Sequence, residues 1–272
     1  MKKITVFLSD DHAVFREGLR LLLEATDDIE VIGEAENGRR TVAETKRLQP
    51  DVVLMDIVMP ALNGIEAARR IAREVPDTRV LILSSYSGDE YVQQAMAAGA
   101  AGYLMKETAA KDLLRAVREA GKGKAFFSPP IVARLLHKLR NGTPQSMGGS
   151  ALTSRQTEVV QLIAEGYSSK EMARLLAVSI KTIEKHRQTL MNKLDIHEIA
   201  TLTRYAVSTG IVDSNPYAQQ ASHSSKLSPG YKKSIGPPGV EVPHFSWPER
   251  PVANSAMDPA RLPQIRRAKS QL

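Results

Sequence analysis

Residues 52–64 of this chain read VVLMDIVMPALNG. The first four residues, Val52 to Met55, are apolar, Asp56 follows them, and Asn63-Gly64 then gives a turn signal. An apolar run of this length before an acid and a turn predicts a parallel strand that is buried on both faces. Open α/β sheets place their chemistry at the carboxyl ends of their strands. Asp56 is therefore the first candidate functional residue.

Polar side chains also follow three other apolar runs. Asp10 and Asp11 follow ITVFL, Ser84 follows VLIL, and Lys106 follows GYLM. Carboxylate oxygens suit Mg²⁺, and a lysine pairs with phosphoryl oxygens as a point charge. The set therefore predicts a site that holds Mg²⁺ and accepts a phosphoryl group on Asp56, with the Ser84 hydroxyl able to donate to that group.

Each of these residues also has a plain structural explanation. Asp10 and Asp11 can be helix N-caps, Asp56 can cap the loop after its strand, and Lys106 can be a solvated lysine. A lone aspartate at a strand end is more often a cap than a nucleophile. The occurrence of all these groups at successive strand ends favours the functional interpretation.

Strand and helix patterns alternate five times in the first 121 residues. The predicted strands are residues 4–8, 31–35, 52–55, 80–83 and 102–105, and the predicted helices are residues 13–23, 38–48, 64–73, 89–98 and 109–120. Five βα units predict the α/β class: a (βα)5 doubly wound parallel sheet, flavodoxin-like, with helices on both faces.

The composition of the chain changes along its length and predicts four parts. These are the α/β domain at residues 3–121, a linker with a short helix (131–139) at 122–150, an all-helical domain at 151–213 and a disordered Pro-rich basic tail at 214–272. Nine of the fifteen prolines lie in that tail among few aliphatic residues. Burial there cannot offset the entropy cost of ordering the chain.

The all-helical part has the pattern of a helix-turn-helix. Its predicted helices are residues 154–165, 169–176, 182–194 and 199–209, and Thr153 with Gln156 forms a capping box before the first of them. The third helix and the residue before it carry four basic side chains and His186 between apolar positions that face a core. Such a helix fits the major groove of DNA, although a basic amphipathic helix is usually only a solvated face.

Charge and composition narrow the class of protein further. The formal net charge is +7, but the residues from Ser214 onward carry +5 of it. Net charge alone therefore does not indicate a nucleic-acid partner, and the prediction of DNA binding depends on the local basic helix. The chain has no cysteine, and its six histidines are scattered, which argues against thiolate and histidine metal sites. No run approaches the ~18 apolar residues of a membrane span, and the first apolar run is too short for a signal peptide. We expect a cytoplasmic protein without a membrane partner.

Four segments of the α/β part resemble the receiver domain of two-component response regulators: Asp10-Asp11, LMDIVMPALNG, LILSS and GAAGYLMK. The resemblance implies that a sensor histidine kinase phosphorylates Asp56. It also implies that Asp10, Asp11 and the backbone carbonyl of Val58 help to bind Mg²⁺.

The same resemblance assigns a switch to this domain. It implies that the hydroxyl of Ser84 and the ring of Tyr103 move together on activation. Two positions depart from the common receiver pattern: Ser84 stands where threonine is commoner, and Glu107 follows Lys106 where many receivers have proline.

Residues 152–194 resemble the LuxR-type DNA-binding domain along their whole length. The resemblance implies contacts to base edges from Glu184, Lys185 and Gln188, and contacts to the DNA backbone from Lys181, Thr182, Arg187 and Lys193. A receiver followed by this module is similar to the NarL/FixJ family, and the resemblance covers about residues 3–212. It implies double-stranded DNA as a partner and a homodimer on that DNA.

The leading hypothesis is a transcription factor, not an enzyme, that is controlled by phosphorylation of Asp56. One alternative is a Mg²⁺-dependent phosphohydrolase with an aspartyl-phosphate intermediate. Val58 argues against it, because a haloacid-dehalogenase-type phosphatase has a second acid at that position. The other alternative is a DNA-binding dimer that does not depend on phosphate, and the intact set of acids argues against that.

Overall fold

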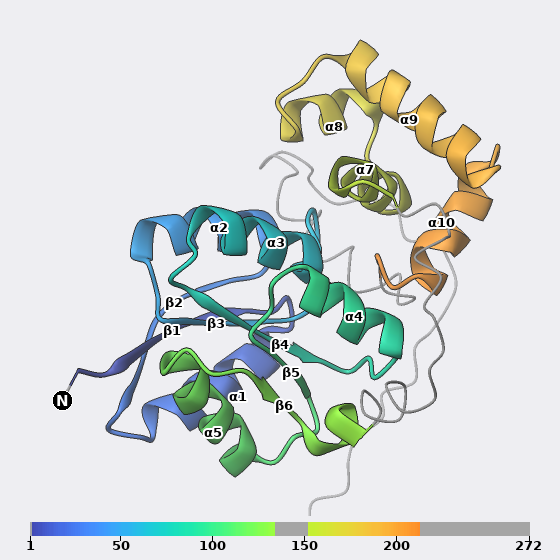
Figure 1. The fold of residues 1–272 in the computed structure, drawn as a ribbon. Helices are drawn as coiled ribbons and strands as arrows, with labels where there is room; N and C mark the ends of the chain where they lie inside the picture. Colours follow the sequence, from blue (N-terminus) through green and yellow to red (C-terminus); the bar gives the residue numbers. More distant parts are fainter. Residues whose placement is uncertain (1, 134–151, 213–272) are drawn as a thin grey trace, which may run out of the picture. The chain divides into compact units, whose positions relative to one another are not determined.

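The computed structural model describes residues 2–133 and 152–212, which form an α/β region and a helical region (Figure 1). The elements of the α/β region are β1 (Ile4–Ser9), α1 (Ala13–Glu24), β2 (Ile29–Ala35), α2 (Gly38–Leu48), β3 (Val52–Met55), α3 (Gly64–Glu74), β4 (Arg79–Ser84), α4 (Asp89–Ala97), β5 (Gly102–Met105), α5 (Ala110–Gly121) and β6 (Phe126–Phe127). The five predicted βα units are confirmed, and no boundary moves by more than two residues.

The strands of the α/β region form one parallel sheet in the order β2-β1-β3-β4-β5-β6. The chain leaves β1 toward β2 and then returns to the other side of β1 for β3. This reversal opens a crevice outside the carboxyl ends of β1 and β3, where doubly wound sheets bind their ligands. The last residues of neighbouring strands are in register, as Ser9 pairs with Met55 and Ser84 pairs with Met105.

Helices cover both faces of this sheet (Figure 1). Side chains of α2, α3 and α4 pack on one face with Phe7, Val53 and Ile82, while side chains of α1 and α5 pack on the other face with Leu8 and Leu54. All four residues of β3 are buried, as a central parallel strand requires. The apolar run that ends at Asp56 is therefore the middle of the core.

A sixth strand extends the sheet beyond the five that the sequence predicts. β6 has only two residues and pairs with β5 through Gly102 and Phe126. A Cβ atom at Gly102 would lie 2.0 Å from the carbonyl oxygen of Phe126, so glycine is what allows this close approach. A strand this short has no alternating pattern by which the sequence could reveal it.

The helical region consists of α7 (Ser154–Ala164), α8 (Ser169–Leu175), α9 (Ile180–Leu194) and α10 (Ile199–Ser208). Thr153 and Ser168 each form a capping box, at α7 and α8 respectively. The side chain of Ser179 accepts a hydrogen bond from the backbone N–H of Thr182, and for this reason α9 begins at Ile180, two residues earlier than predicted. Ala177, with φ of 51°, makes the turn between α8 and α9.

Two predicted parts of the chain fall wholly or largely beyond the structure's described ranges. Residues 129–133 are helical, which begins the short helix predicted for the linker, and its remainder lies outside the described residues. The Pro-rich basic tail at 214–272 also lies outside them. Within residues 2–133 and 152–212, no helix has the length and apolar character needed to cross a membrane.

Candidate functional site

Side chains from three strand ends meet at the carboxyl edge of the sheet. Asp10 follows β1, Asp56 follows β3 and Lys106 follows β5. The backbone N–H of Asp56 donates to the carbonyl of Ser9 at 2.8 Å, which holds the ends of β1 and β3 together. We call Asp10, Asp11, Asp56 and Lys106 the acid pocket.

Lys106 joins two carboxylates of the acid pocket. Its Nζ lies 2.8 Å from Asp10 Oδ2 and 2.9 Å from Asp56 Oδ2, and its side chain is only 14% exposed. The same Nζ lies 4.8 Å from the centre of the Phe15 ring on α1, within the range of a cation–π contact. A buried cation needs partners of this kind, since an unpaired charge in the interior is strongly destabilising.

Burial disfavours the ionised forms of the carboxylates in the acid pocket. Burial raises the pKa of Asp56, and Asp10 raises it further, against the opposing effect of Lys106. Burial also raises the pKa of Asp11. Burial disfavours the charge on Lys106, but Asp56 and Asp10 outweigh that effect and raise its pKa. A second cation in the acid pocket would therefore relieve repulsion among the carboxylates.

The donor atoms of the acid pocket fit a divalent cation. Asp10, Asp11, His12 and Asp56 each offer a ligand atom, and these atoms all lie within 4.8 Å of one another. Asp11 Oδ1 is buried and has no hydrogen-bond partner, although His12 Nδ1 lies 2.9 Å from it. Buried polar atoms are rarely left unsatisfied, so an ion at this place is a physical explanation for the orphan oxygen.

The capping explanation for Asp10 and Asp11 does not match the local structure. The N-cap residue of α1 is His12, and no side chain caps this helix. Asp10 Oδ1 accepts a hydrogen bond from the backbone N–H of His12 at 2.8 Å, which turns the chain between β1 and α1. Asp56 Oδ1 accepts from the backbone N–H of Ile57 at 2.8 Å, leaving Oδ2 for Lys106.

The loop between β3 and α3 depends on Asn63 and Gly64. The side chain of Asn63 caps α3, and the N–H of Gly64 donates to the carbonyl of Ile57 at 2.7 Å. A Cβ atom at Gly64 would lie 1.8 Å from the carbonyl oxygen of Asp56, so only glycine fits there. Val58, whose carbonyl the sequence predicts as a metal ligand, lies in this loop with its side chain against the core.

Ser84 and Tyr103 are linked through the backbone of Tyr86. The Oγ of Ser84 accepts a hydrogen bond from the N–H of Tyr86 at 3.1 Å. The hydroxyl of Tyr103 donates to the carbonyl of Tyr86 at 2.5 Å, and the Tyr103 side chain is buried. A displacement of Ser84 therefore reaches Tyr103 through one residue of the loop after β4.

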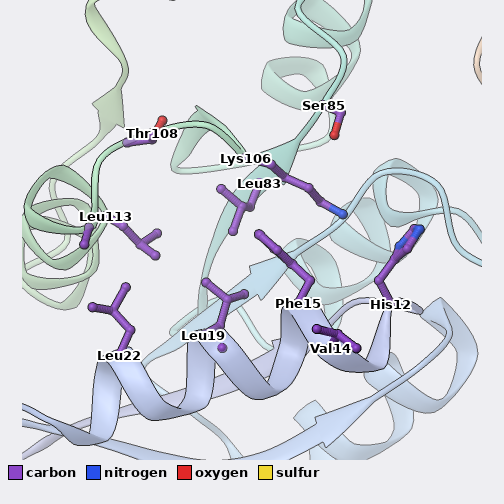
Figure 2. Close-up of a pocket in the computed structure, with 12 residues that line it drawn as sticks. His12, Val14, Phe15, Leu19, Leu22, Leu83, Ser85, Lys106, Thr108 and Leu113 are labelled. Atoms are coloured by element: carbon purple, nitrogen blue, oxygen red, sulfur yellow. The ribbon is translucent and has the colours of Figure 1, made fainter. Parts of the chain in front are cut away.

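A groove of about 620 Å³ opens beside Lys106 between α1 and the start of α5 (Figure 2). Apolar side chains line most of it, among them Phe15, Leu19 and Leu113. Val14 lies at this groove with 89% of its surface exposed. The groove gives the acid pocket an approach from the side of α1.

The predicted DNA-contacting residues lie along α9. Lys181, Glu184, Lys185, Gln188 and Lys193 are exposed, while Thr182 and Arg187 are half-buried. Arg187 Nη1 donates to Ser169 Oγ of α8 at 3.1 Å, so this side chain also ties the two helices together. The opposite face of α9 is in the core through Ile183 and Leu190. The helix thus carries four basic side chains and one acidic side chain, and the face opposite its buried residues is exposed to solvent.

Three residues near the acid pocket were not predicted from the sequence. Phe15 lies over Lys106, Arg16 Nη1 donates to the carbonyl of Asp10 at 2.6 Å, and His12 Nδ1 lies 2.9 Å from Asp11 Oδ1. His12 was missed because the histidines were judged only by their spacing from one another, and not by their spacing from aspartates. Its position directly after two aspartates was the available signal. No sequence signal indicated Phe15 or Arg16, because their contacts depend on how α1 packs on the sheet.

Comparisons with known families agree with this architecture. The family of response regulator receiver domains matches residues 6–118, and the luxR family of bacterial regulatory proteins matches residues 150–206. The transcriptional regulatory protein LiaR of Bacillus subtilis is 39% identical over 203 residues, which are 75% of this chain and 96% of LiaR. The chain belongs to the NarL/FixJ-type response regulators, which join a receiver to a LuxR-type DNA-binding domain, and it is a two-component transcription regulator.

Two further relatives cover the same part of the chain. The response regulator VraR of Staphylococcus aureus is 33% identical, over 77% of this chain and 99% of VraR. RcsB from Salmonella enterica serovar Typhimurium, in a structure bound to a promoter in the presence of the phosphomimetic BeF3⁻, is 28% identical with a TM-score of 0.53. That match covers 76% of this chain and 100% of RcsB.

Proposed function

We propose that a sensor histidine kinase phosphorylates Asp56 and that this modification controls sequence-specific binding to double-stranded DNA. The observation that carries the proposal is the convergence of Asp10, Asp56 and Lys106 from three strand ends, with contacts of 2.8 and 2.9 Å. A DNA target supports our proposal that the protein acts in the cytoplasm. We take residues 3–121 as the receiver, 122–150 as the linker, 151–213 as the DNA-binding domain and 214–272 as an accessory tail.

The acid pocket would hold Mg²⁺ through Asp10, Asp11, Asp56 and the backbone carbonyl of Val58. When bound, Mg²⁺ supplies positive charge that neutralises the carboxylates and the oxygens of the incoming phosphoryl group. A carboxylate oxygen of Asp56 attacks phosphorus, the bond from phosphorus to the donor breaks, and the leaving group keeps that electron pair. Lys106 then moves from the carboxylate to a phosphoryl oxygen, where its charge continues to be paired.

Ser84 and Tyr103 would change their hydrogen bonds in response to phosphorylation of Asp56. The Ser84 hydroxyl, which follows β4, turns toward the new phosphoryl oxygens on Asp56, and its hydrogen bond from the Tyr86 N–H is lost. Tyr86 then shifts, and the hydroxyl of Tyr103 loses its acceptor on that residue. A phosphoryl group adds about −1.5 to −2 charge and strong acceptors, which is sufficient to bias a loop between two arrangements.

The exposed face of α9 would enter the major groove. Glu184, Lys185 and Gln188 lie on that face and would contact base edges. The basic residues Lys181, Arg187 and Lys193, with Thr182, would bind the DNA backbone. Helix-turn-helix proteins commonly bind two half-sites as dimers, so the response to phosphorylation would be a homodimer on DNA.

DNA affinity with and without a small phosphodonor tests this function. A binding site is first enriched from random double-stranded DNA, and its Kd is then measured for the wild type and for Asp56→Ala, with and without acetyl phosphate and Mg²⁺. We expect the donor to tighten binding by the wild type at least about 10-fold and to leave the variant unchanged. Equal stimulation of both proteins would refute control through Asp56.

The same preparation tests the two other functions. We propose that the protein does not turn over phosphate esters, because Val58 offers no general acid two residues after Asp56. Steady hydrolysis of a generic phosphate ester that is lost in Asp56→Ala would show an enzyme instead. Tight DNA binding without any phosphorylated protein on a phosphate-affinity gel would show a phosphate-independent dimer.

A further inference from the structure

His12 is a side chain with metal-binding capacity that the chemistry proposed for Asp56 does not use. It begins α1 directly after Asp10 and Asp11, and its backbone N–H is held by Asp10 Oδ1 at 2.8 Å. Its Nδ1 lies 2.9 Å from Asp11 Oδ1 and 3.2 Å from Asp10 Oδ1. Figure 2 shows its ring projecting from the start of α1 on the side toward which the amine of Lys106 points.

The distances allow His12 and the aspartates to bind one ion. The donor atoms of Asp10, Asp11, His12 and Asp56 all lie within 4.8 Å of one another. Opposite ligands of a cation with bonds of about 2.0–2.2 Å lie about 4.0–4.4 Å apart, so small rotations bring these donors onto one centre. The His12 side chain is 55% exposed, so little packing opposes such a rotation.

The contact between His12 and Asp11 is short but is not a hydrogen bond. The atoms Nδ1 and Oδ1 lie 2.9 Å apart, yet Asp11 Oδ1 has no hydrogen-bond partner, because the angles of this contact do not suit a hydrogen bond. His12 Nδ1 also lies within hydrogen-bond distance of Asp10 Oδ1, at 3.2 Å, and the tautomer of the ring decides whether Nδ1 donates there or keeps a lone pair for an ion. Asp11 Oδ1 is itself buried, so it faces into the acid pocket rather than into bulk water.

We propose that His12 is a ligand of the cation in the acid pocket and that its nitrogen makes the pocket prefer transition-metal cations such as Ni²⁺ and Mn²⁺ over Mg²⁺. This inference rests on the proposed function, since it concerns the same cation. Mg²⁺ takes oxygen ligands and gains little from an imidazole. Imidazole suits Ni²⁺ and other late cations, and affinities for such sites rise from Mn²⁺ toward Ni²⁺.

A simpler arrangement of the same atoms makes the opposite prediction. If His12 were only an ion-pair partner of Asp10 and Asp11, a bound cation would displace its ring. Removal of the ring would then strengthen the binding of every divalent cation, including Mg²⁺. If His12 is a ligand, its removal weakens the binding of Ni²⁺ and leaves that of Mg²⁺ almost unchanged.

Calorimetric titrations of the full chain with Mg²⁺ and with Ni²⁺ separate these arrangements. The variant is His12→Gln, and His197→Gln is the matched control, because His197 Nε2 also lies 3.5 Å from a carboxylate, that of Asp195, but His197 belongs to no group of metal-ligating side chains within residues 2–133 and 152–212. The double variant Asp11→Asn, Asp56→Asn gives the background from binding elsewhere. We expect His12→Gln to lose Ni²⁺ affinity by at least about 10-fold, with Mg²⁺ affinity within about 2-fold of the wild type.

Pulsed electron paramagnetic resonance of the Mn²⁺ complex gives a readout of the ligand itself. The wild type and His197→Gln should show modulation from a directly bound ¹⁴N nucleus, and His12→Gln should not. Unchanged Ni²⁺ affinity in His12→Gln, or tighter binding of both cations, would overturn the assignment, as would ¹⁴N modulation that survives in this variant. If the wild type binds neither Mg²⁺ nor Ni²⁺ above the background, the cation site of the proposed function fails and the inference fails with it.

Discussion

The acid pocket brings together side chains from the ends of β1, β3 and β5, whereas the exposed face of α9 comes from a helix of fifteen consecutive residues. Asp10 and Lys106 are nearly a hundred positions apart in the sequence, and the sheet brings their charged atoms to 2.8 Å. Neighbours on α9 meet because a helix repeats every 3.6 residues. Functional geometry is thus a long-range property in the first case and a local one in the second.

This difference predicts different responses to mutation. In the acid pocket Asp10 and Asp56 are buried, Asp11 and Lys106 are partly buried, and the four lie close together, so the loss of one changes the whole set. On α9 five of the seven predicted contacts are exposed and only Thr182 and Arg187 are half-buried, so most of them should contribute a modest and nearly independent amount. Substitutions in the two regions should separate these responses.

Gly64→Ala should cause the largest loss of stability. The new Cβ atom would lie 1.8 Å from the carbonyl oxygen of Asp56, and a backbone atom cannot yield as a flexible side chain can. We expect the α/β region to lose about 3 kcal/mol and its Tm to fall by roughly 10 °C in differential scanning calorimetry of the full chain.

Gly18→Ala is the matched control, since a Cβ atom there meets nothing within 4 Å on α1. Alanine in a helix interior should stabilise the region by about 0.5–1 kcal/mol. Equal Tm changes in the two variants would mean that the loop after Asp56 does not need its glycine.

Lys106→Ala should slow phosphorylation of the protein by acetyl phosphate about 100-fold, the cost of removing one positioned charge from a transition state. Its affinity for Mg²⁺ should be equal to or higher than that of the wild type, because the ammonium no longer competes for Asp10 and Asp56. The rate is measured on phosphate-affinity gels and the affinity by calorimetry. Lys111→Ala, on an exposed position of α5, should match the wild type in both; a normal rate in Lys106→Ala would contradict the role of the ammonium.

Gln188→Ala should change which DNA is bound rather than how salt affects binding. Loss of one base contact should cost about 1–3 kcal/mol on the preferred site and little on random DNA, with the salt dependence of Kd unchanged. Fluorescence anisotropy on both DNAs at several salt concentrations measures this. A uniform loss on both DNAs would mean that Gln188 is not a base reader.

Lys181→Ala and Lys193→Ala should each reduce the slope of log Kd against log salt by about 0.9 and leave sequence preference intact. The two residues are about 18 Å apart along α9, so their free-energy effects should add to within about 0.5 kcal/mol in the double variant. A double variant that loses much more than the sum would show that α9 acts as one cooperative unit, like the acid pocket.

The contrast also explains how much could be predicted from the sequence. Local patterns were sufficient for the five βα units and for the capping box of Thr153 and Gln156, which the structure confirms. β6 was missed because two residues carry no periodicity, and α9 was placed two residues late because the cap at Ser179 was not recognised as its start.

The candidate site divides in the same way. The strand-end pattern and the resemblance to receivers named Asp10, Asp11, Asp56 and Lys106, together with Val58, Ser84 and Tyr103. They did not name His12, Phe15 or Arg16. The position of Phe15 over Lys106 and the link from Ser84 to Tyr103 through Tyr86 depend on the packing of α1 and on the loop after β4. Such contacts between elements leave no mark in a single sequence.

Identifying the residue that carries the phosphoryl group is the decisive measurement for phosphorylation of Asp56. The wild type is incubated with acetyl phosphate in Mg²⁺ or in EDTA, reduced with borohydride to convert an aspartyl phosphate to homoserine, and digested for mass spectrometry. The account predicts homoserine at position 56 alone, and only when the divalent cation is present. Modification at another aspartate, or equal modification of Asp56 in EDTA, would contradict it.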